Sequence, residues 1–150
     1  MLHSLLRKII LGLSGSLFYT TVKDCGGGMS IFTVNSVSLT PPNPTPGQDV
    51  GLTLDYTVPP GMYVTNGQVE YAITYNFIPF APSYEPLCAN VPCPLTPNTY
   101  KNTSFSKWPT GLSGSVTTKM SWLDLDENLL LCVQISGQMG DLKKVALTER

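Results

Sequence analysis

Histidine is almost absent from this chain of 150 residues, since the only one is His3. Its scarcity nearly excludes histidine-based catalysis and ordinary zinc sites in the body of the protein. Charged residues make up only 13% of the chain, and its nine Lys and Arg residues are scattered, with a net charge of -1. Because phosphate neutralisation needs clustered basic residues, we expect no nucleic-acid partner.

Catalytic motifs are also missing from the sequence. It has no activated-serine pattern and no glycine-rich phosphate loop after a strand. Acid pairs can support glycoside chemistry, but the cluster of Asp124, Asp126 and Glu127 is more typical of a solvated turn. We therefore expect no enzymatic activity, no cofactor and no metal.

The first 22 residues have the order of a secretory signal, with a basic pair followed by the apolar run 9–19. Cleavage near Ser16 would leave a very short apolar core, and a site nearer Thr21 is equally possible. A short helix or an uncleaved anchor is the alternative. We accordingly assign residues 1–22 to a leader and expect a protein that is secreted or resides in the endolysosomal lumen.

The rest of the chain is expected to form one domain over residues 23–137, followed by a frayed tail, 138–150, in which the strand pattern is lost. Nothing after the leader has the length of a membrane span, and no window shows helical periodicity beyond two turns.

Four cysteines, an even number, read as two disulfides behind a signal peptide. Three pairings are possible. Cys88–Cys93 is locally plausible, and it leaves Cys25–Cys132, which would join the start of the domain to its last strand. Zinc is the rival interpretation of "CANVPCPL", but the chain has no CxxC motif and no histidine pair to supply the other ligands.

Apolar and polar residues alternate through most of the domain, which predicts strands. The clearest is "VGLTLDYTV". The other candidates are "SIFTVNSVSL", "QVEYAITYNF", "VTTKMSWLD", "NLLLCVQIS" and a weaker sixth, "NTYKNTSFSKW". Turn signals such as "TPPNPTPGQ" and "DLDEN" separate them. The pattern predicts an all-β antiparallel sandwich.

Several large aromatic residues fall on the faces predicted to point inward: Tyr56, Tyr71, Tyr75, Phe77 and Trp122. They fit either a closed core or the wall of a cavity between two sheets. The proline-rich segment 76–95 adds apolar side chains, Phe80 among them, that either cover the core or line an opening. A matching segment carries Trp108 and Leu112.

Residues 24–137 carry four motifs in this order: "DCGGG", "SVSLTPPNPTPGQDVGLTLDY", "CANVPCPL" and "MSWLDLDENLLLCVQI". Taken together, these motifs resemble the ML (lipid-recognition) domain family. The proline-rich turn is similar to the family's phosphatidylglycerol/phosphatidylinositol transfer branch, and the cysteine pairs to its Niemann-Pick type C secreted sterol carrier. The resemblance implies an immunoglobulin-like β-sandwich with an apolar cavity between its sheets, and lipid binding without catalysis.

By position, the resemblance puts Phe80 at the cavity mouth, Met120 and Trp122 on a lining strand, and Val69 and Ile73 on the strand before Phe80. With the inward faces of the strands, this implies a lipid-binding set of Leu52, Leu54, Tyr56, Val69, Tyr71, Ile73, Ile78, Phe80, Trp108, Leu112, Met120 and Trp122.

The function expected from these features is non-catalytic binding and intermembrane transfer of a phospholipid or sterol. We expect a monomer that contacts membrane surfaces transiently. Asn102, in "NTS", is a candidate N-glycosylation acceptor. The alternative is an immunoglobulin-like adhesion or recognition module with a closed core.

Overall fold

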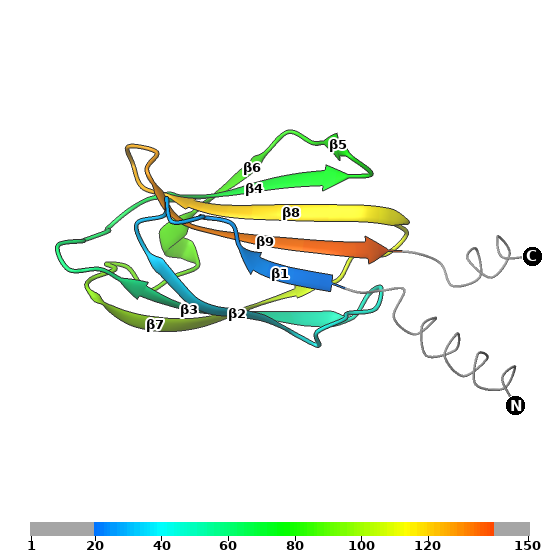
Figure 1. The fold of residues 1–150 in the computed structure, drawn as a ribbon, viewed down its shortest axis with the longest axis horizontal. Coiled ribbons are helices and arrows are strands. Elements are labelled where there is room, and N and C mark those ends of the chain that lie inside the picture. The colour runs from blue at the N-terminus through cyan, green and yellow to red at the C-terminus, as the bar shows by residue number, and fades with distance from the viewer. Residues whose placement is uncertain (1–19, 140–150) are drawn as a thin grey trace, which may run out of the picture.

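Nine strands and a short 3-10 helix make up residues 20–139, the part of the chain that this computed structural model describes. Two antiparallel sheets lie face to face as two layers (Figure 1), so the predicted antiparallel, immunoglobulin-like β-sandwich is confirmed. The elements are β1 Thr20–Asp24, β2 Thr33–Thr40, β3 Asp49–Val58, β4 Gln68–Tyr75, β5 Ile78–Pro79, β6 Ser83–Pro86, η1 Leu87–Ala89, β7 Asn98–Lys107, β8 Gly114–Leu123 and β9 Leu129–Met139.

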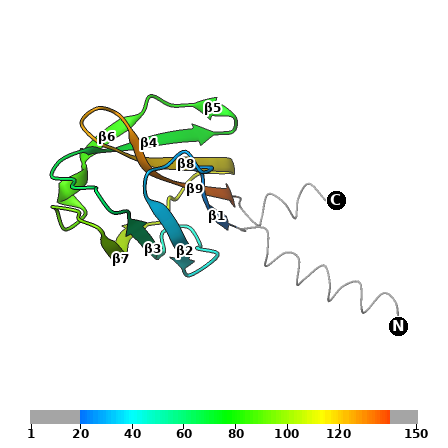
Figure 2. The same cartoon turned by 60° about the vertical axis from the view of Figure 1, so that its left-hand side comes forward.

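Among the described residues, no strand ladder joins the two sheets on either side of the sandwich. The larger sheet runs β1, β9, β8, β4, and both short strands β5 and β6 pair with β4. The smaller sheet runs β2, β3, β7. On one side β1 packs beside β2. On the other, the chain passes from β6 to β7 through η1, from one layer to the other (Figure 2).

Six of these strands, β2, β3, β4, β7, β8 and β9, are the ones that alternation predicted. In β3, for example, Val50, Leu54, Tyr56 and Val58 are buried, and the last three belong to the hydrophobic core. The three strands that the sequence did not predict, β1, β5 and β6, are short edge strands. β5 and β6 each contain a proline, which edge strands tolerate because its missing N–H is not needed for pairing.

Phe77 corrects one expectation, because it does not continue the inward face of β4. The strand ends at Tyr75, and Asn76 and Phe77 form the two-residue turn into β5 with φ of 47° and 66°. Two-residue hairpins favour positive φ at both central positions because this matches the twist of the strands. The Phe77 side chain is 88% exposed at this turn.

The first and last described strands extend a few residues past the boundaries proposed above. β1 begins at Thr20, inside the expected leader, and pairs with β9 from Thr20 opposite Gly137 to Asp24 opposite Val133. β9 in turn extends to Met139. The remaining parts of the expected leader and tail, 1–19 and 140–150, lie outside the described residues. Within the described part, no helix is long and apolar enough to cross a membrane.

Tyr56 lies at the centre of an aromatic cluster between the sheets. Its ring stacks on Phe32 and Tyr100, with centroids 6.0 and 5.4 Å away, and meets Trp122 edge-on at 5.0 Å. Its hydroxyl is buried without a hydrogen-bond partner among the described residues. Burial, and secondarily the Tyr100 phenol, raises the pKa of Tyr56 to about 12. The cluster therefore fills one part of the sandwich tightly.

We expect Tyr56→Phe to raise the free energy of unfolding by up to about 1 kcal/mol, because it removes a buried hydroxyl that has no partner in the described structure. Tyr100→Phe is the matched control. The Tyr100 hydroxyl donates to the Thr96 carbonyl at 3.2 Å and accepts from the Thr96 N–H at 3.1 Å, so its loss should lower stability by about 1 kcal/mol. Urea unfolding measures both. A destabilised Tyr56→Phe protein would show that the hydroxyl is satisfied.

Tyr56 also predicts a loss of stability at high pH. Its pKa is about 12 in the folded protein and 10 for an ordinary tyrosine, so the phenol ionises first in the unfolded chain. The part of the free energy of unfolding that depends on Tyr56 staying neutral is therefore fully present below pH 10 and is lost as the pH rises toward 12. Urea unfolding across this range should show a shallower decline for Tyr56→Phe than for the wild type. Equal declines would contradict the assignment.

Candidate functional site

A small pocket of about 50 Å³ lies between the two sheets, near the end at which η1 connects β6 to β7. Six of its lining residues are apolar or aromatic and come from β3, β4 and β8, and the others are polar and come from β7 and the end of η1. The full lining is Leu52, Leu54, Val69, Tyr71, Met120, Trp122, Asn90, Asn102 and Ser104.

Strand register explains why this lining has an apolar and a polar side. Residues opposite one another in antiparallel strands share a face. In the larger sheet Val69 lies opposite Trp122, and Tyr71 opposite Met120, so this wall is apolar apart from the tyrosine hydroxyl. In the smaller sheet, leucines of β3 lie opposite polar residues of β7, Leu54 opposite Asn102 and Leu52 opposite Ser104. The edge strand β7 therefore gives the pocket a polar rim.

A chain of hydrogen bonds runs along this rim. The Asn102 amide donates to the Asn90 carbonyl at 3.3 Å, and the Asn90 amide donates to Glu85 Oε2 at 3.3 Å. The Tyr71 hydroxyl donates to the same Glu85 oxygen at 3.4 Å. Glu85 belongs to β6 and lies opposite Val69, on the inward face. Burial, and then the Glu85 carboxylate, raises the pKa of Tyr71, so Tyr71 is a neutral donor at physiological pH.

Beyond Tyr71 the inward face of β4 becomes exposed. Ile73, Phe80 and Ile78 are 40%, 55% and 63% exposed. Ile78 lies opposite Tyr75, and the Phe80 N–H donates to the Ile73 carbonyl at 2.8 Å, so this apolar strip continues the pocket wall onto β5.

The β4–β5 hairpin is fixed to the start of β8. The Asn76 N–H donates to the Ser115 carbonyl at 2.8 Å, and the Asn76 side chain accepts from the Ser115 N–H at 2.9 Å. The Tyr75 hydroxyl donates to the Ser113 carbonyl at 2.7 Å. These bonds hold the turn in one position although its apolar side chains face solvent.

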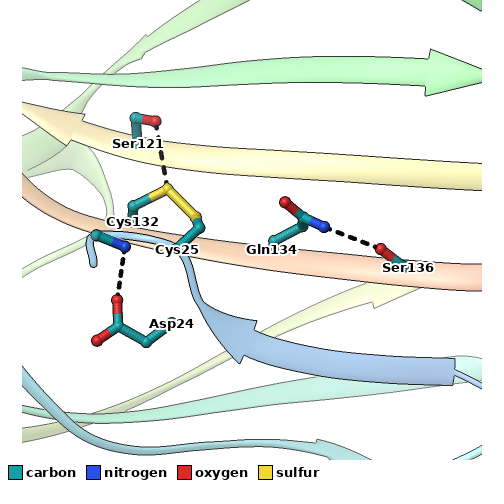
Figure 3. The surroundings of a disulfide bond; sticks show 7 residues. Asp24, Cys25, Ser121, Cys132, Gln134 and Ser136 are labelled. Carbon is teal, nitrogen blue, oxygen red and sulfur yellow. Dashed lines mark hydrogen bonds between the residues drawn. A yellow bond between two sulfur atoms is a disulfide. The ribbon is translucent and has the colours of Figure 1, made fainter.

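Both disulfide pairings favoured by the sequence are present, so all four cysteines are bonded. Cys25–Cys132 joins the end of β1 to β9, and Ser121 Oγ donates to Cys132 Sγ at 3.9 Å (Figure 3). Its neighbours in the register, Trp122 and Leu131, face inward, so this disulfide lies on the far side of the sheet from the pocket.

Cys88–Cys93 has a Cα–Cα distance of 5.4 Å and closes the short segment that contains η1. That segment carries Asn90 into the pocket rim. The second disulfide therefore constrains the polar edge of the pocket, and with both cysteines bonded to each other neither is a thiolate available to zinc.

The predicted set divides into four groups. Six members line the pocket. Tyr56 lies in the closed aromatic core, and Ile73, Ile78 and Phe80 form the exposed strip. Trp108 is half-buried after β7, where its backbone N–H donates to the Gln48 carbonyl at 2.8 Å. Leu112 is exposed in the connection to β8.

The polar rim is what the sequence reasoning missed. Alternation along β7 places Tyr100, Asn102 and Ser104 on one face, and this signal could have identified the part of the rim that β7 supplies. Asn102, the candidate glycosylation acceptor, is part of it. A glycan on Asn102 would project from the pocket opening, so glycosylation there and access through this edge would compete.

The acidic cluster forms the β8–β9 turn. Asp124 Oδ1 accepts the N–H groups of Asp126 at 2.9 Å and Asn128 at 2.8 Å, and its Oδ2 accepts from the Asn128 amide at 3.0 Å. Burial alone would raise the pKa of Asp124, but these bonds together lower it. The carboxylate is committed to shaping the turn.

Comparison with known proteins gives a consistent result. A family model described as the ML domain matches residues 19–139. A protein of Dictyostelium discoideum, provisionally named a phosphatidylglycerol/phosphatidylinositol transfer protein, is 25% identical over 134 residues, covering 84% of this chain and 91% of that protein.

Two solved structures share the fold. A Niemann-Pick type C2 protein from the Japanese carpenter ant aligns with a TM-score of 0.55 at 13% identity, covering 77% of this chain and 96% of that one. Chicken MD-1 complexed with lipid IVa aligns with a TM-score of 0.52 at 9% identity, covering 79% and 88%. At these identities the alignments establish the fold alone.

Proposed function

This chain belongs to the ML-domain family, and on that premise we propose that it binds one lipid between its sheets and carries it between membranes without altering it chemically. The observation that carries the proposal is the pocket, whose apolar wall continues onto an exposed apolar strip. The named activity of the Dictyostelium discoideum relative supports a phospholipid as cargo, with a sterol as the second possibility.

Binding would require the sheets to separate. The pocket of about 50 Å³ is well below the roughly 300–1,000 Å³ of typical ligand sites. Within the described residues no strand pairing joins β6 to β7, so these edges can move apart without breaking a ladder. The Asn102–Asn90 hydrogen bond would open, and burial of the lipid tail, at roughly 25 cal/mol per Å², would offset that loss.

Contact with a membrane is the second part of the proposal. Glycine usually occupies the second position of this turn type, and a bulky residue with positive φ costs about 1–2 kcal/mol. Phe77 has a φ of 66° and is 88% exposed. Burial of its ring in an apolar phase outside the protein would offset the cost of this backbone conformation. Phe77, Ile78 and Phe80 would enter the headgroup region of a bilayer.

The two disulfides suit an oxidising compartment, so we propose that the protein is secreted or lies in the endolysosomal lumen. It would act as a monomer, because the pocket is formed within one chain. An adhesion or recognition module with a closed core has less support, since such a module has no use for an apolar pocket that continues to the surface.

We expect Met120→Trp to weaken lipid binding by at least about tenfold, because the larger ring would fill the pocket that Met120 lines. Met29→Trp is the matched control, since Met29 is 84% exposed in the loop after β1. Titration with a fluorescent phospholipid measures affinity, and urea unfolding checks that both variants fold.

Unchanged affinity in a folded Met120→Trp protein would remove the pocket as the binding site. If the wild type carried no extractable lipid by mass spectrometry and bound no fluorescent lipid, the lipid-binding proposal would be wrong and the closed-core module would take its place.

Phe77→Ala and Phe80→Ala should each slow lipid transfer between vesicles by about tenfold, the effect of losing one aromatic contact with the bilayer. Equilibrium affinity for a soluble short-chain lipid should change less than about twofold for Phe77→Ala. Phe105→Ala is the control, because Phe105 is 80% exposed on the outward face of the other sheet, opposite Gly51. Equal transfer rates for all three variants would contradict the assigned membrane contact.

A further inference from the structure

We propose that the rim between β6 and β7 receives the polar head of the bound lipid and favours heads without net negative charge. This inference rests on the proposed lipid binding and adds the class of cargo to it. The groups that would contact the head are the side chains of Glu85, Tyr71, Asn90 and Asn102.

The rim offers hydrogen bonds of both kinds to a small uncharged head. Amide N–H groups of Asn90 and Asn102 and the Tyr71 hydroxyl are donors, and the Glu85 carboxylate is an acceptor. Their present partners are one another, so a hydroxyl group of a ligand could replace one rim contact without leaving a group unsatisfied. A positively charged ammonium group would also find the Glu85 carboxylate.

Negative charge at the rim has no compensating cation among the described residues. Four lysines lie in the described part of the chain, and each lies on an outward strand face. Lys107 pairs with Asp49 at 2.9 Å on the far face of the smaller sheet, and the others are Lys23, Lys101 and Lys119.

A lipid phosphate seated at this rim would therefore lie near Glu85 with no protein cation among the described residues to offset it, and only a head that carries its own cation, as phosphatidylcholine does, would compensate the charge. Two like charges a few ångströms apart at a protein surface repel strongly enough to weaken binding by about fivefold to a hundredfold, depending on local solvent. Phosphatidylglycerol and phosphatidylinositol, the lipids in the name of the Dictyostelium discoideum relative, both carry such a charge. The rim thus predicts a preference for lipids without net negative charge, in contrast to the two anionic lipids in that relative's name.

The test is competition between lipids for the wild type and two charge variants at low ionic strength, where screening is weak. The competitors are a phosphatidylglycerol, a phosphatidylcholine with the same acyl chains, and cholesterol. Glu85→Gln removes the rim carboxylate. Glu70→Gln is the matched control, because Glu70 is in the neighbouring strand but lies opposite Tyr84 and Ser121, on the outward face. Protein from a bacterial periplasm would form its disulfides and carry no glycan on Asn102.

We expect the wild type and Glu70→Gln to bind phosphatidylcholine at least about fivefold more tightly than phosphatidylglycerol. Glu85→Gln should bring the two affinities within about twofold, and Glu85→Lys should reverse the preference. If the cargo is a sterol, Glu85→Lys should leave the affinity for cholesterol unchanged, because the cholesterol head is an uncharged hydroxyl. If the cargo is a zwitterionic phospholipid, cholesterol should fail to displace it.

A wild type that binds lipids but prefers phosphatidylglycerol, or a preference unchanged in Glu85→Gln, would overturn the assigned rim and leave the proposed lipid binding intact. A wild type that binds none of the three lipids would overturn both.

Discussion

The pocket lies at the edge where β6 of one sheet and β7 of the other meet without strand pairing. On the opposite side β1 packs beside β2, and the disulfide between Cys25 and Cys132 ties the end of β1 to β9. On that side the N–H groups of Ile31 and Phe32, just before β2, donate to the Leu129 and Leu130 carbonyls of β9, so backbone hydrogen bonds join the two layers there. The pocket lies on the β6–β7 side, where widening would open the Asn102–Asn90 hydrogen bond but would break no strand ladder.

The aromatic cluster limits how far that widening can spread. Trp122 both lines the pocket and contacts Tyr56, whose ring is stacked between Phe32 and Tyr100. Separating those rings would forfeit dense packing. Along the other direction the inward face of β4 is already partly in solvent at Ile73. A lipid tail should therefore extend along β4 toward the β5 hairpin and leave the cluster closed.

The long strands were predictable from sequence because one face of each is buried, so that burial imposes a period of two, as in β3. The apolar wall followed from the same period. The hairpin was not predictable, because Asn76–Phe77 lacks the glycine that usually marks such a turn. The polar rim was missed for a different reason. Its members come from η1, β6 and β7, and only tertiary packing brings Glu85 to Asn90 and Tyr71.

One end of β4 lies at the polar rim and the other at the apolar β5 hairpin, and the distance between them is close to the length of a lipid tail. Glu85 lies opposite Val69, and Phe80 bonds to Ile73, so rim and hairpin are four residues apart along β4, roughly 13 Å at 3.3 Å per residue. Half of a bilayer's hydrocarbon core is about 15 Å. A tail that starts with its head at the rim would therefore end near the hairpin. If Phe77 enters the membrane as proposed, that tail end would be the first part of the cargo to meet the bilayer, and the polar head would leave the rim last.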